Sequence, residues 1–222
     1  MRRRPKPAKT KIDGKQPPPG DSAKTDDARV ADLETRLAEA VGQLQTRERQ
    51  QTATSEILRV ISTSPTDAQP VFSAIAESAA RLTGAVVITV YEFDGSLVHL
   101  RAAEPSDHPH ADSFRQNFPR PPAPDFAAGR VILDRAVLHR ADLQNDPDTP
   151  ELTRAWARRM DLRSVLWVPM LRGTVPIGVI GAVRREIGLF ADDEVRLLQT
   201  FADQAVIAIE NVRLFTETKE AL

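Results

Sequence analysis

Five side chains that could contact a small molecule fall within strand-like stretches of this sequence: Thr89, Tyr91, His99, Arg101 and Trp167. Hydroxyl, imidazole, guanidinium and indole N–H groups can orient a ligand, because binding pockets combine an apolar lining with a few placed polar contacts. On a half-exposed sheet face the same groups would simply be hydrated. The sequence leaves both interpretations open.

Two other patterns could in principle hold a cofactor. His99 or His139 could serve as a haem ligand, and the acidic and imidazole groups of residues 107–112 could be drawn as a metal cluster. A lone histidine in a strand is more often structural, and Pro109 interrupts the cluster, which has no obvious supporting groups. We therefore expect neither haem nor a metal and identify no cofactor.

The 222 residues include no cysteine. This excludes disulfides, thiolate zinc sites, iron–sulfur clusters, cysteine nucleophiles and the attachment of a bilin through cysteine. The sequence also has no nucleophile-elbow, phosphate-loop or zinc-protease motif. We expect a chain that is not an enzyme.

Alternating strands and helices must position the candidate side chains. Strands are predicted at 86–93 and 97–102, joined by Asp94-Gly95, which is a strong hairpin signal. Side-chain alternation places Thr89 and Tyr91 on one face of the first strand. Gly178 and Ala182, on the same face as Ile180, would let a helix approach the opposite side of the sheet, so we expect the pocket on the face of Thr89 and Tyr91.

The remaining elements complete an α+β pattern. Helices are predicted at 70–82, 126–134, 150–160 and from 192 onward, and strands at 137–140, 164–171 and 175–184. Asp192 is the expected N-cap of the last helix, and Gly84 is a C-cap candidate. Residues 104–124 contain six prolines and cannot be regular structure, so this long loop is typical of a lid or a binding loop.

Two helical stretches carry apolar residues at alternating steps of three and four, from Val30 to Ile61 and from Leu198 to Leu222. This is the a/d spacing of a coiled coil, although its middle is polar at Arg47, Gln51 and Thr54. The predicted homodimer seam comprises Leu33, Leu37, Leu44, Leu58, Phe201, Ala205 and Val212. The alternative is a single amphipathic helix packed on its own domain.

Residues 1–25 hold five of the 17 prolines and most of the excess positive charge, while the whole chain carries a net charge of −1. Such a segment is expected to be a disordered tail. It could tether the protein electrostatically or merely keep it in solution, and we do not expect nucleic-acid binding. There is no secretory signal and no membrane-span-length apolar run, which favours a cytoplasmic location.

Several motifs taken in order resemble the GAF domain family. Ser164 to Leu171, Ile177 to Ile180, Phe190 with Asp192, and Leu197 to Asn211 resemble its closing half. Residues 51–62, followed by Pro70-Val71-Phe72, resemble the linker and first helix of GAF modules in bacterial hybrid sensor histidine kinases. The resemblance covers about residues 50–215.

That resemblance implies an α+β, profilin-like fold: an antiparallel sheet of about six strands flanked by helices, with a small-molecule pocket under loops. It also implies parallel dimers that signal through long flanking helices to an output kinase or cyclase, which this chain does not contain. The expected layout is a tail at 1–25, a coiled-coil helix at 26–62, a GAF domain at 63–215 with its terminal helix from 192, and the start of a second coil at 216–222.

Known GAF subclasses narrow the function further. The cyclic-nucleotide signature is absent, because Phe190 to Glu194 has the wrong spacing and no Asn-Lys pair precedes it. GAF-fold methionine sulfoxide reductases need cysteine. The sequence therefore predicts a cytoplasmic two-component sensor module for an unknown small molecule. The alternative is a ligand-free dimerisation spacer or a truncated sensor fragment.

Overall fold

The computed structural model describes residues 21–64, 66–105 and 115–220, and the chain divides into two compact units, 1–47 and 48–222. Helix α1, Asp21–Thr63, begins in the first unit and ends in the second. Nothing in the described part of the chain is both long and apolar enough to form a membrane-spanning helix. The predicted tail at 1–25 lies outside the described residues except for the first turn of α1.

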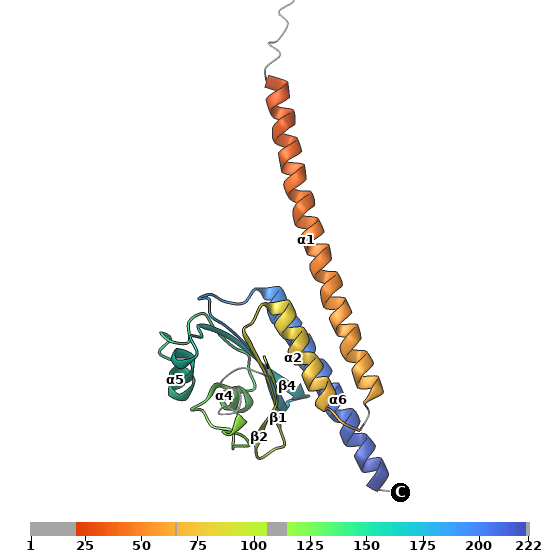
Figure 1. The fold of residues 1–222 in the computed structure, drawn as a ribbon, viewed down its shortest axis with the longest axis vertical. Coiled ribbons are helices and arrows are strands. Elements are labelled where there is room, and N and C mark those ends of the chain that lie inside the picture. Colours follow the sequence, from red (N-terminus) through yellow and green to blue (C-terminus); the bar gives the residue numbers. More distant parts are fainter. Residues whose placement is uncertain (1–20, 65, 106–114, 221–222) are drawn as a thin grey trace, which may run out of the picture. The chain divides into compact units, whose positions relative to one another are not determined.

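A five-stranded antiparallel sheet forms the centre of the second unit, with strand order β2-β1-β5-β4-β3 (Figure 1). Its strands are β1, Val87–Phe93; β2, Val98–Glu104; β3, Leu138–Arg140; β4, Ser164–Arg172; and β5, Val175–Arg184. The α+β fold is confirmed, although the described residues contain five strands rather than the expected six or so. Both predicted hairpins are present, with Gly95 at a φ of 100° in the first turn.

Two helices and the end of α1 cover one face of this sheet. Helix α2 spans Gln69–Thr83 and helix α6 spans Asp192–Glu220, and Figure 1 places both on the same side of the strands. The core here combines Ala53, Ile57 and Ile61 of α1 with apolar residues of α2, α6 and the sheet. The last turns of α1 are therefore part of the domain, which begins before the expected boundary at residue 63.

The opposite face of the sheet carries a second core. Helices α4, Ala127–Asp134, and α5, Glu151–Arg159, lie on this side together with the loop that precedes α4 (Figure 1). The apolar side chains that meet here come from alternate positions of the same strands, including Val87, Tyr91, Val165, Trp167 and Val183. Alternation along each strand thus separates two cores across one sheet.

The predicted dimer seam is corrected on α6. Phe201 and Ala205 are completely buried in the core of their own domain, against α2 and the sheet. They cannot also contact a second chain, because a helix face that packs on its own sheet leaves no surface there. Val212, nearer the end of α6, is half-buried.

The α1 positions of the predicted seam behave differently. Leu33, Leu37 and Leu44 are 60%, 65% and 59% exposed, and Leu58 is 44% exposed. Within the described chain, roughly half of the surface of each of these leucine side chains therefore remains open to solvent. On α1 the residues with coiled-coil spacing are exposed and available to a second chain. On α6 the residues with the same spacing pack within their own domain.

The helix caps agree with the predicted ones, except that the N-cap of α6 lies one residue earlier than expected. Gly84 ends α2 with a φ of 61°, as its predicted C-cap role requires. Asp192 is the first residue of α6, so the capping position falls on Ala191 and not on Asp192. Glu194 accepts a hydrogen bond from the Ala191 backbone N–H at 2.8 Å, which satisfies a donor at the helix start.

Candidate functional site

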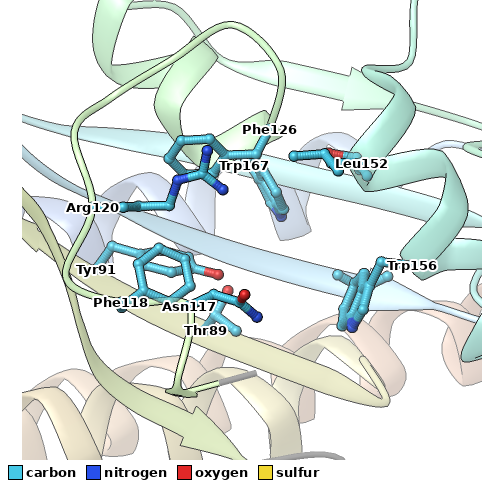
Figure 2. A pocket seen from close by; sticks show the side chains of 11 residues that line it. Thr89, Tyr91, Asn117, Phe118, Arg120, Phe126, Leu152, Trp156 and Trp167 are labelled. Carbon is cyan, nitrogen blue, oxygen red and sulfur yellow. The ribbon is translucent and has the colours of Figure 1, made fainter. Parts of the chain in front are cut away.

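A cavity of about 180 Å³ lies on the α4/α5 side of the sheet. Its walls come from β1, β4, β5, α5 and the loop before α4, and Figure 2 shows their side chains surrounding a common space. The lining residues are Thr89, Tyr91, Asn117, Phe118, Arg120, Phe126, Leu152, Thr153, Trp156, Trp167 and Val183.

The floor of the cavity is a row of three residues across three strands. Thr89 of β1 pairs with Gly181 of β5, which pairs in turn with Trp167 of β4. A Cβ atom on Gly181 would stand 2.4 Å from Trp167 Nε1 and 2.9 Å from Thr89 Oγ1. The missing side chain of Gly181 therefore makes room for the two flanking polar groups.

These polar groups are buried without partners. Thr89 is 2% exposed and Trp167 is 6% exposed, and neither Thr89 Oγ1 nor Trp167 Nε1 has a hydrogen-bond partner among the described residues. Leaving a buried donor or acceptor unpaired costs about 1–3 kcal/mol. Two such atoms on one cavity floor are explained if a bound molecule or water completes their hydrogen bonds.

Tyr91 forms the neighbouring wall and is 2% exposed. Burial raises the pKa of its phenol, so the hydroxyl stays protonated at neutral pH. The nearby Thr89 hydroxyl opposes this rise in the pKa of Tyr91. The Thr89 and Tyr91 hydroxyls do not meet the geometry of a hydrogen bond, so Thr89 Oγ1 has no partner among the described residues.

Aromatic rings continue from Tyr91 across the cavity. The Tyr91 and Phe118 ring centroids are 5.1 Å apart, and those of Phe118 and Phe126 are 6.1 Å apart. These separations suit tilted and edge-to-face ring packing. Trp156 of α5 stands across the space from Tyr91 in Figure 2. Five of the eleven described lining residues are therefore aromatic.

Arg120 is held over the cavity by backbone bonds. Its N–H donates to the Val98 carbonyl at 3.1 Å, and its carbonyl accepts from the Val98 N–H at 2.8 Å. The guanidinium lies 4.3 Å from the Phe126 ring centre and donates from Nη2 to both carboxylate oxygens of Asp125 at 3.3 Å. The loop thus presents one cation at the edge of an aromatic cavity.

Helix α4 supports this loop through a close approach at Gly129. A Cβ there would stand 2.4 Å from the Ala123 carbonyl oxygen and 2.6 Å from the Ala123 nitrogen. Only a residue without a side chain lets the loop backbone pass so near the helix. Gly129 therefore helps to fix the position from which Arg120 and Phe126 reach the cavity.

Three of the five sequence candidates lie together at the cavity: Thr89, Tyr91 and Trp167. His99 and Arg101 do not line it. His99 Nε2 lies 2.7 Å from Asp94 Oδ2, and Arg101 Nε donates to Glu92 Oε2 at 2.6 Å.

The reason for this separation is the pairing of β1 with β2. His99 lies opposite Glu92, and Leu100 lies opposite Tyr91, so Leu100 and not His99 shares the cavity face. Arg101 is the extra residue of a register shift, because Tyr91 pairs with Leu100 while Val90 pairs with Ala102. Simple alternation could not reveal this shift.

The sequence interpretation missed the cavity residues contributed by the loop and by α5: Asn117, Phe118, Arg120, Phe126, Leu152, Thr153 and Trp156, together with Val183 of β5. One signal pointed to the loop, because its proline content was typical of a binding loop. Its described part, from residue 115, does border the cavity.

The two cofactor patterns have different outcomes. The cluster at 107–112 lies outside the described residues, and within the described ranges no group of three or more acidic or imidazole side chains could hold a metal ion. His139 accepts a hydrogen bond from the Phe190 backbone N–H at 2.7 Å through Nε2, and the two rings lie 5.9 Å apart. Its imidazole thus joins β3 to the segment that leads into α6.

This bond predicts a pH dependence of stability, because only neutral His139 can accept it. Burial, followed by the charges of Arg140 and Arg184, lowers the pKa of His139 below 6.5, while Asp192 and Glu194 act in the opposite direction. As the pH falls, His139 is therefore protonated at a higher pH in the unfolded chain than in the folded one. The contribution is complete above pH 6.5 and is lost as the pH falls from there through the folded pKa.

The expected result is that wild-type protein loses more thermal stability between pH 7.5 and 5.5 than His139→Gln, whose side-chain oxygen can accept the same bond without titrating. Melting temperatures measured across that range test the prediction. Parallel curves for the two proteins would assign no role to His139 in the acid response.

The geometry defines an α+β domain with helices on one sheet face and a ligand-sized, partly aromatic cavity under a loop on the other. Residues 67–209 match the GAF domain family. The chain belongs to this family of small-molecule-binding signalling modules. No curated protein matches the chain.

Solved structures share the fold. The GAF domain/HD domain protein from Geobacter sulfurreducens is 23% identical, with 68% of this chain and 97% of that chain covered at a TM-score of 0.58. The GAF domain of a phosphoenolpyruvate-protein phosphotransferase from Coxiella burnetii is 15% identical, with coverages of 79% and 98% and a TM-score of 0.62. Free methionine-R-sulfoxide reductase from Neisseria meningitidis, solved with its substrate, is 18% identical, with coverages of 76% and 90% and a TM-score of 0.59.

Proposed function

We propose that this chain is a cytoplasmic, non-enzymatic sensor module that binds a small ligand in the aromatic cavity. Its ligand state would pass through the flanking helices of a homodimer to an output domain, with a histidine kinase as the expected type. The observation that carries the proposal is the pair of buried polar atoms on the cavity floor, Thr89 Oγ1 and Trp167 Nε1, which have no hydrogen-bond partner in the part of the chain that the structure describes. A ligand that hydrogen-bonds to them would remove the cost of leaving them unpaired.

The sheet offers a route from the cavity to the helices. Trp167 lies on the cavity face of β4, while its neighbours Leu166 and Val168 lie in the other core with Phe201 of α6. A small shift of β4 on ligand binding would therefore be felt by α6. Arg172, at the end of β4, donates to Glu210 of α6 at 2.7 Å and makes a second connection.

Transmission of this kind requires two helix arrangements of similar energy, each favoured by one ligand state. Arg213 on α6 also donates to Glu210, at 2.9 Å, so Glu210 is shared between the sheet and the helix. The carboxylate could exchange one arginine for the other as α6 shifts. This sharing supports α6 as the moving element.

The proposed homodimer rests on α1. The part of α1 that lies in the first unit has five apolar residues that are between 44% and 65% exposed: Val30, Leu33, Leu37, Val41 and Leu44. These residues recur at steps of three and four and lie along one side of a helix, as in a coiled-coil seam. A second copy of the same helix is the occupant that matches this spacing.

Native mass spectrometry of the full chain, purified without denaturation, tests both parts. The expected result is a dimer that carries extra mass per chain. Leu37→Asp should give monomers, because it places a charge in the seam, whereas the control Leu133→Asp, at a half-exposed side chain of α4, should leave the dimer intact. Thr89→Val should lower the share of chains with the extra mass.

A dimer without extra mass, before and after incubation with a small-molecule extract of the source cells, would favour the alternative of a ligand-free spacer. A wild-type monomer would contradict the dimeric route. Leu37→Asp dimers would show that the helices associate through another surface.

A further inference from the structure

The charge of the cavity lining limits the ligand, provided that the proposed sensor function holds. Among the described residues of the lining, Arg120 is the single charged one, and none is an aspartate or glutamate. A cationic ligand would have to leave water for a site where the charge of Arg120 repels it. The lining therefore favours a ligand with a negative group.

The position of Arg120 places that negative group at the rim. The Arg120 side chain is 29% exposed, and Leu152 beside the cavity is 50% exposed, whereas Thr89 and Trp167 are almost fully buried. A charged ligand group that stays near the rim keeps part of its hydration and still meets the guanidinium. The apolar part of the ligand would then point inward.

The size of the cavity fits one aromatic ring with substituents. An apolar cavity of about 150 Å³ in another protein holds benzene, and this cavity measures about 180 Å³. Five of its described lining residues are aromatic, so a flat ring could pack against Tyr91, Phe118 and Trp156 in tilted or edge-to-face contacts.

The floor of the cavity defines the far end of the ligand. Trp167 Nε1 is a donor only, while the Thr89 hydroxyl can donate and accept. A ring hydroxyl matches both, since it can accept from the indole N–H and donate to Thr89 Oγ1. Gly181 leaves the space between them unfilled.

Arg120 retains donors for such a ligand. Its described side-chain hydrogen bonds use Nη2 alone, at 3.3 Å from each oxygen of Asp125, which is 49% exposed. Both distances exceed those of a strong charge-assisted bond. Asp125 thus occupies one edge of the guanidinium weakly, and a ligand carboxylate could use another edge.

From these five observations we propose that the cavity binds a single-ring aromatic carboxylate with a ring hydroxyl. The carboxylate would pair with Arg120 at the rim, and the hydroxyl would contact Thr89 and Trp167 at the floor. Asp125 would act as a competing carboxylate that limits the affinity.

Isothermal titration calorimetry with three probes of similar size tests the charge preference: 4-hydroxybenzoate, 4-hydroxybenzyl alcohol and tyramine. Charge-assisted hydrogen bonds contribute about 1.5–3 kcal/mol, so 4-hydroxybenzoate should bind at least about tenfold more tightly than the alcohol. Tyramine should bind most weakly. Equal binding of acid and alcohol, or tighter binding of tyramine, would overturn the proposal.

Variants test each named residue. Arg120→Gln should remove the preference for the acid over the alcohol, whereas the control Arg159→Gln, an exposed change on α5, should alter the affinity for neither probe. Asp125→Asn should tighten binding of the acid severalfold and leave the alcohol unchanged. Thr89→Val should weaken the binding of 4-hydroxybenzoate about fivefold. It should not weaken the binding of benzoate, which lacks the ring hydroxyl.

The outcomes also separate this inference from the sensor proposal. If none of the probes binds, the hydroxyaromatic acid is wrong as a ligand class. In that case a copurified mass that Thr89→Val reduces would still support a sensor with a different ligand. If a probe binds as expected, both proposals gain support.

Discussion

Replacing Phe201 with alanine is expected to lower the free energy of unfolding by about 3–5 kcal/mol, since truncating a buried phenylalanine removes its packing and leaves a cavity. Phe201 is completely buried between α6, α2 and the sheet. A loss of this size would exhaust much of the stability of an ordinary domain. Urea denaturation followed by circular dichroism measures it.

Phe215→Ala on the same helix is the matched control, because Phe215 is 37% exposed. It should lower the free energy of unfolding by less than about 1 kcal/mol. The Phe201→Ala loss should also be the same at high and low protein concentration, because the contacts lie within one chain. If this loss depended strongly on protein concentration, Phe201 would have to contact a second chain, which would contradict the packing described above.

Local chemistry made most of the fold predictable from the sequence. Asp94-Gly95 between two β-branched runs marked the first hairpin, and Gly84 marked the end of α2, where φ is 61°. Both signals depend on backbone conformations that few residues adopt. They need no tertiary information, which is why the elements around them were found within one or two residues.

The helical spacing was less informative. Steps of three and four place residues on one side of a helix whether the partner is a second chain or the domain's own sheet. Leu37 is 65% exposed while Phe201 is completely buried, although both satisfy the same pattern. Only the packing of α6 against α2 and β4 distinguishes them, and that packing joins segments far apart in the sequence.

The cavity was predictable only in part, for a related reason. Alternation along β1 gave Thr89 and Tyr91, but the pairing in the hairpin sets His99 opposite Glu92 and leaves Arg101 as the extra residue of the register shift, so neither shares their face. Arg120 reaches the cavity through a backbone bridge to Val98, 22 positions earlier in the chain. No local pattern encodes such a bridge, so loop residues of this kind emerge only from the folded structure.

Substituting alanine for Gly181 is expected to abolish binding in the cavity. The new Cβ would stand 2.4 and 2.6 Å from Nε1 and Cδ1 of Trp167, and the rigid indole can relieve these contacts only by turning into the cavity. Overpacking of this kind typically costs about 1–3 kcal/mol of stability. The affinities for 4-hydroxybenzoate and 4-hydroxybenzyl alcohol should therefore both fall by more than about tenfold, and denaturation should give a moderate loss of stability.

Gly178→Ala separates the loss of the cavity from a general loss of stability. Its Cβ would stand 2.2 Å from the Tyr91 carbonyl oxygen and 1.9 Å from the end of Met170, which lies in the core on the other face. Because a backbone atom must move, this variant should lose at least as much stability as Gly181→Ala. Protein that remains folded should lose less affinity for the probes than Gly181→Ala, because the clash is with the backbone of Tyr91 and the far side of the sheet and not with the Trp167 indole. If Gly181→Ala retained full binding, Trp167 would have room to move elsewhere, and the indole N–H could not be the group that orients the ligand.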